Sequence, residues 1–151
     1  MENFSLFLAS ALWLAGYVVG LGAVTVIDVH GFLGRKSSYW TEATIRTHKI
    51  TKPLIWLGLC LASVGSVWYF MQIGFYDVSY MYLAILGVMV INGLFLSLYI
   101  SPYLLHQEKE GRSQELLPQS LQIKITVSFI FSFIGWWSSF LLVVYVLQFG
   151  L

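Results

Sequence analysis

The sequence predicts an all-α integral membrane protein, built as an up-and-down bundle of four transmembrane helices with a short cytoplasmic interfacial helix. Of the 151 residues, 58% are hydrophobic and only 10% are charged, whereas a soluble domain carries roughly 25% charged residues. Mean hydropathy is +0.79, and the charge-poor stretches exceed the roughly 20 residues that cross a hydrocarbon core. We expect residues 1–151 to form one domain whose main partner is the lipid bilayer.

Polar segments of unequal size separate the four expected spans. We place these spans at about residues 4–27, 54–72, 80–100 and 123–149. The segment 27–53, between the first two spans, holds five of the eight Lys and Arg residues and two of the three His residues. Within it, residues 39–50 are expected to form the interfacial helix, because Tyr39 and Trp40 suit the headgroup region. The second polar segment, residues 103–122, is also charged.

The basic residues give the expected orientation. All eight lie in or beside the two polar segments, at Arg35, Lys36, Arg46, Lys49, Lys52, Lys109, Arg112 and Lys124. Basic residues in short loops stay on the cytoplasmic side. We therefore expect a protein of the cell (inner) membrane with both polar segments cytoplasmic and both termini extracytoplasmic. The formal charge of +1 comes with no basic face, so we expect no nucleic-acid partner.

Small residues at helical spacing predict close contact between helices. Such residues let two backbones approach each other, and a mid-span amide bonds across helices. The residues expected to pack in this way are Gly16, Gly20, Gly58, Ala62, Ser66 and Asn92. Because a glycine face can also be shared between copies of the chain, a homo-oligomer is a further expectation.

The candidate site consists of the three histidines and one acid near them. His30, His48 and His106 all fall at the basic end of the expected bundle, and Asp28 lies near His30. Imidazole binds metals and haem iron, and a carboxylate adds a hard oxygen ligand. We expect the three histidines to bind haem b or a divalent transition metal, with Asp28 either as a further ligand or as a residue that orients a histidine. The alternative is that these histidines simply face water, with no cofactor.

Several classes of function are disfavoured by what the spans lack. No Asp, Glu, Lys, Arg or His lies deep in any expected span, and proton relays, voltage sensors and ion pathways usually need such groups. The single cysteine, Cys60, excludes an intrachain disulfide. No nucleophile–base–acid set and no phosphate-binding loop appear, so the sequence predicts no particular reaction and leaves open whether the protein is an enzyme.

Two stretches carry a family resemblance. The first span ends in IDVHGFLGRK, and the second opens with KPLIWLGLCL. The layout resembles that of small four-span bacterial membrane proteins of the HemJ and CopD-like kind. HemJ proteins bind haem and are associated with oxidising protoporphyrinogen to protoporphyrin, so the resemblance implies a tetrapyrrole-handling role. His30 and, more loosely, Arg46 carry over; the family's early His is absent, and Asp28 replaces a basic residue.

Three functions are consistent with these observations. The first is a membrane protein that binds haem, another tetrapyrrole or a transition metal through its cytoplasmic histidines, with a redox-related role. The alternative is a non-enzymatic accessory or structural protein that acts through helix–helix assembly. The third is an oligomeric pore or carrier of neutral solutes, because a pore can form between chains.

Overall fold

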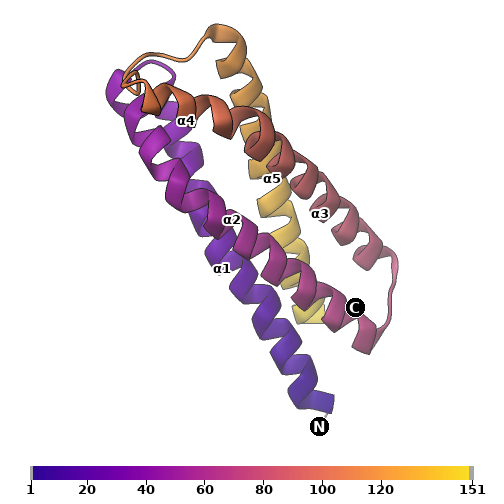
Figure 1. Ribbon diagram of the computed structural model, residues 1–151. Helices are drawn as coiled ribbons and strands as arrows, with labels where there is room; N and C mark the ends of the chain where they lie inside the picture. The colour runs from indigo at the N-terminus through magenta and orange to yellow at the C-terminus, as the bar shows by residue number, and fades with distance from the viewer. Residues whose placement is uncertain (1, 150–151) are drawn as a thin grey trace.

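The computed structural model describes residues 2–149, and its regular structure is entirely helical within that range. The elements are α1 (Glu2–Gly34), α2 (Ser38–Ile73), α3 (Asp77–Phe95), the π-helical turn η1 (Leu96–Ile100), α4 (Ser101–Lys109) and α5 (Gln119–Phe149). Because α3, η1 and α4 follow one another without a break, the described chain forms four long rods that alternate in direction (Figure 1).

All four rods are long and apolar enough to cross a membrane, with lengths between 31 and 36 residues. This confirms the prediction of an all-helical chain with four helices of spanning length. A hydrocarbon core needs only about 20 helical residues. Each rod is therefore longer than the core requires, by about 16–24 Å at 1.5 Å per residue.

The expected short interfacial helix is not a separate element. Residues 39–50 are helical, but α2 continues from them through Pro53 to Ile73. Pro53 lacks the N–H that would bond to the carbonyl of Lys49, which is why the sequence suggested a boundary there. Packing of α2 along α1 outweighs this one lost bond. The helix begins after Ser37, whose hydroxyl accepts a hydrogen bond from the Trp40 backbone at 3.5 Å.

Small residues line the contact between α1 and α2. A Cβ atom added to Gly16 would lie 2.7 Å from the Gly58 carbonyl oxygen, and one added to Gly65 would lie 2.7 Å from the Trp13 Cα. Ala62 and Ser66 are buried on the same helix. The glycine stripe that could have joined two copies of the chain is thus occupied by a contact within one chain.

Hydrogen bonds between side chains join the remaining rods. Asn92 of α3 donates to the Ser128 carbonyl at 3.2 Å, and its amide oxygen accepts from the Ser128 hydroxyl at 2.6 Å. Nearer the start of α3, Tyr82 accepts hydrogen bonds from the Trp13 indole at 2.8 Å and from the Tyr17 hydroxyl at 3.1 Å. These bonds fix α3 against α5 and α1.

Candidate functional site

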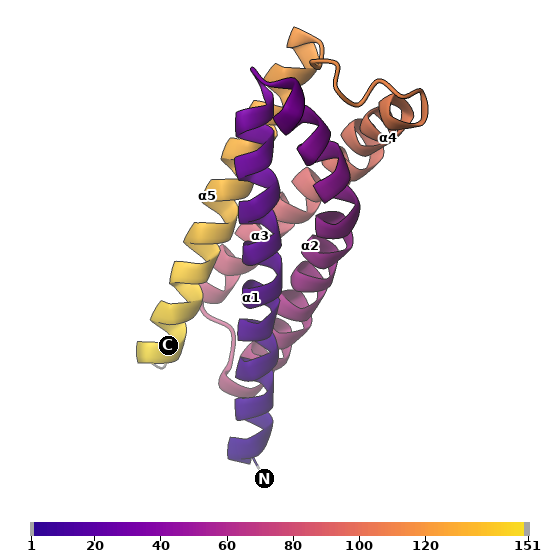
Figure 2. The same ribbon diagram turned by 90° about the vertical axis from the view of Figure 1, so that its left-hand side faces the viewer.

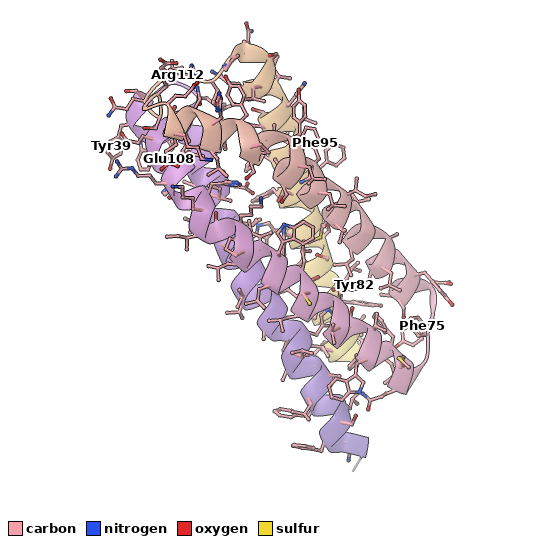
Figure 3. All side chains as sticks on the ribbon, in the orientation of Figure 1. Tyr39, Phe75, Tyr82, Phe95, Glu108 and Arg112 are labelled. Atoms are coloured by element: carbon pink, nitrogen blue, oxygen red, sulfur yellow. The ribbon has the colours of Figure 1, made fainter. Side chains whose placement is uncertain are left out.

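The two polar segments meet at one end of the bundle and form a charged cap. Lys49 of α2 pairs with Glu108 of α4 at 2.7 Å, and Gln114 donates to Glu42 at 2.9 Å. Figure 3 shows Glu108 and Arg112 at this end, far from Tyr82, and Figure 2 shows the segment after α4 crossing this end to reach α5. Hydrogen bonds from Arg112 lower the pKa of Glu110. The cap thus closes the end where the basic residues gather.

A cavity of about 130 Å³ lies beneath this cap. Its wall draws residues from α1, α2, η1, α4 and α5. A water molecule needs roughly 10–15 Å³ of such space, so the cavity has room for several waters or for part of an organic molecule. Most of the wall is apolar, with side chains such as Ile55, Leu96, Ile100 and Phe129. The few polar groups in the wall are therefore the ones that a ligand would meet.

Two of these polar groups have buried atoms without a hydrogen-bond partner. They are the Asp28 Oδ2 atom and the His48 Nε2 atom, both in side chains that line the cavity. The described residues contain two other such atoms, on Tyr76 and Gln107, and neither residue lines the cavity. Leaving a buried polar group unpaired costs about 1–3 kcal/mol. Asp28 and His48 thus both line one cavity, and each has a side-chain atom with unused bonding capacity.

A lysine from α2 reaches across the cavity wall to the π-helical turn. Lys52 Nζ lies 3.5 Å from the Ser97 carbonyl oxygen and 3.2 Å from the Ser101 hydroxyl. The Trp56 indole donates to the Ser97 hydroxyl at 3.0 Å. A π-helical turn shifts the hydrogen-bonding register of a helix, and such turns are frequent at functional sites. Here the turn presents Ser97 to two side chains of α2.

The structure separates the residues that the sequence grouped as ligands. Of the four, only Asp28 and His48 line the cavity. His30 Nδ1 lies 3.1 Å from the Thr47 hydroxyl, and the His30 ring lies against Trp40 at 5.3 Å. His106 pairs with Glu110 at 3.2 Å, with 67% of its side chain exposed. Within residues 2–149, no group of three or more His, Cys, Asp or Glu side chains could hold a metal ion.

Three cavity residues were missed by sequence reasoning: Lys52, Trp56 and Ser97. A signal for the first two exists, because Thr44, His48, Lys52 and Trp56 follow one another at intervals of four. Residues four apart share one face of a helix, and all four line the cavity. Lys52 was interpreted only as a charge that orients the chain. Ser97 carries no such signal, since nothing in LSLYI marks a π-helical turn.

Comparisons with known proteins add no relative: no protein-family model, curated protein or solved structure matches this chain. The resemblance to the HemJ and CopD-like proteins therefore stays a prediction.

Proposed function

We propose that this protein is an integral membrane protein that binds a small amphipathic ligand in the cavity beneath its charged cap. The observation that carries this proposal is that Asp28 and His48 both line one mainly apolar cavity, and that each has a buried polar atom without a hydrogen-bond partner. Ligand sites combine an apolar lining with a few placed polar groups in this way. The ligand would donate a hydrogen bond to Asp28, bond to His48 and pack its apolar part against the wall.

The proposed topology follows from the charges and the helix lengths. With the cap on the cytoplasmic side, all eight basic residues obey the positive-inside rule. The first turns of α2 would then extend beyond the hydrocarbon core into the headgroup region, with Tyr39 and Trp40 at the interface. In this arrangement the cavity lies near the boundary between headgroups and acyl chains. A ligand dissolved in the bilayer would reach that depth with its polar end toward the cap.

Retention of a bound molecule tests the proposal. The full chain, purified in mild detergent, would be examined by native mass spectrometry and by solvent extraction. We expect a bound molecule on the wild type, and its loss from both Asp28→Leu and His48→Leu. Asp77→Asn, at the first residue of α3 and outside the cavity wall, should keep it. A wild type that carries no small molecule, or a molecule that stays on both cavity variants, would overturn the proposal.

A tetrapyrrole is a second candidate ligand, and one observation favours it. His48 lines the cavity and its buried Nε2 atom has no hydrogen-bond partner, and neutral imidazole nitrogen is the usual haem ligand. Protein purified from haem-supplemented cells would show a Soret band that is lost in His48→Ala and kept in the exposed-site variant His106→Ala. A colourless wild type, with no iron or other transition metal by elemental analysis, would exclude haem and metal binding together.

A further inference from the structure

The wall of the cavity contains more positively charged side chains than negatively charged ones. Lys52 and Arg35 both line it, whereas Asp28 is the one carboxylate among the described residues of its wall. The Arg35 guanidinium lies over the Phe32 ring at 3.9 Å, and its Nε donates to the Phe32 carbonyl at 3.2 Å. Neither cation forms an ion pair with a carboxylate of residues 2–149. The wall thus holds two cations and one carboxylate, and neither cation is paired with that carboxylate.

The direction of the Lys52 side chain is informative. A lysine at the end of a membrane span ordinarily extends its ammonium outward to the headgroups, which costs little. Lys52 instead turns inward to Ser97 and Ser101 on the neighbouring rod. A carbonyl and a hydroxyl accept hydrogen bonds from the ammonium but do not neutralise it, and a half-buried cation without a counter-charge is unfavourable. An acidic group in the cavity would supply this counter-charge.

The size of the cavity limits which part of a ligand it holds. A space of about 130 Å³ accommodates a head group but not a whole lipid. The tail of an amphipathic ligand would therefore leave the cavity and lie along the apolar outer surface of the rods, where side chains such as Leu94, Phe95 and Leu98 are exposed. The expected ligand has a small polar head and a long apolar tail.

Resting on the proposed function, we propose that the ligand is an amphipathic acid, a lipid whose carboxylate or phosphate head is bound by the Lys52 ammonium beside Ser97 and Ser101. Arg35, the residue after the end of α1, provides a second positive charge in the wall. A head that also has an O–H group, such as a singly protonated phosphate, can in addition donate a hydrogen bond to Asp28, which lines the same cavity. Lys52 is thus the residue that selects an acid over a neutral amphiphile of the same length.

Binding of matched probes to the purified full chain tests this assignment. Radiolabelled oleate carries an acidic head, and oleyl alcohol has the same tail with a neutral head. We expect Lys52→Gln to weaken oleate binding about tenfold or more, a loss of about 1.4 kcal/mol or more, because it removes one partner of a charge pair that is shielded from water. Oleyl alcohol binding should change less than twofold, and Lys52→Arg should restore oleate binding. Inorganic phosphate, which has no tail, should not displace oleate.

Lys124→Gln is the matched control. Lys124 lies outside this cavity, where its ammonium bonds to the Tyr99 hydroxyl at 2.9 Å, so both probes should bind this variant as they bind the wild type. An unchanged thermal transition for Lys52→Gln, followed by circular dichroism, excludes a folding defect.

The outcomes separate the two proposals. Equal affinity of the wild type for both probes, with no effect of Lys52→Gln, would overturn the acid assignment and leave the cavity as a site for neutral amphiphiles. Displacement of oleate by inorganic phosphate would overturn the requirement for a tail. Binding of neither probe, together with no co-purifying molecule, would instead overturn the proposed function itself.

Discussion

The two halves of the bundle differ in how their buried polar atoms are hydrogen-bonded and in how closely their helices pack. In one half, the buried polar atoms of Trp13, Tyr17 and Tyr82 bond to one another, and backbones touch through small residues. In the half beneath the cap, Asp28 and His48 have buried atoms without partners around an open cavity. Satisfied polar networks rigidify a core, whereas unsatisfied ones weaken it. The first half therefore holds the helices together, whereas the second has unused bonding capacity, on which the proposed ligand site depends.

The largest expected loss of stability comes from forcing α1 and α2 apart where their backbones touch. Gly16→Leu would drive a side chain into the backbone of α2 near Gly58 and Ala62, and overpacking of this kind costs about 3 kcal/mol. We expect little monodisperse protein by size-exclusion chromatography. Gly22→Leu is the matched control on the same helix, because a Cβ at Gly22 meets nothing within 4 Å. Similar yields from the two variants would contradict the proposed role of this contact.

The second effect concerns the hydroxyl at the centre of the same half. Tyr82→Phe removes the acceptor of both Trp13 and Tyr17, in side chains that are at most 2% exposed. With two buried donors left unpaired, we expect a loss of about 2 kcal/mol, seen as a lower thermal transition by circular dichroism. Tyr80→Phe, at a residue that is 62% exposed, should leave the transition where it is.

The third prediction is a gain in stability rather than a loss, and it tests the half of the bundle that contains the cavity. His48→Leu replaces a buried, unpartnered nitrogen with an apolar side chain of similar size. We expect the ligand-free protein to gain about 1 kcal/mol of stability, measured as a higher thermal transition after delipidation. A lower transition would show that His48 stabilises the fold rather than reserving bonding capacity.

The smallest effect is expected at the cap. The Lys49–Glu108 pair joins α2 to α4, but half of the Lys49 side chain is exposed. Exposed ion pairs contribute about 0.2–1 kcal/mol and are screened by salt. Lys49→Gln should therefore lower the thermal transition slightly at low salt and not at all at high salt. A large, salt-independent loss would mean that the cap, rather than the Tyr82 half, holds the bundle together.

The candidate site was only partly predictable from the sequence. His48 and Asp28 were grouped because both lie at the basic end of the bundle, and both line one cavity; their role as ligands stays a prediction. His30 and His106 were expected in the same group, since sequence position gives their depth in the bundle. Depth does not determine in which direction around the helix axis a side chain points. His30 turns toward Thr47, and His106 turns toward Glu110 and solvent.

Composition and hydrophobic run length alone determined that this chain forms four long apolar helices, because a hydrocarbon core demands long uncharged segments with internally bonded backbones. The positions of the charged residues alone predicted at which end of the bundle the polar side chains lie. Only the tertiary structure decided that α2 runs unbroken through Pro53, that η1 presents Ser97, and that Lys52 turns inward. These features depend on helix rotation and on contacts between distant segments, which a local pattern does not encode.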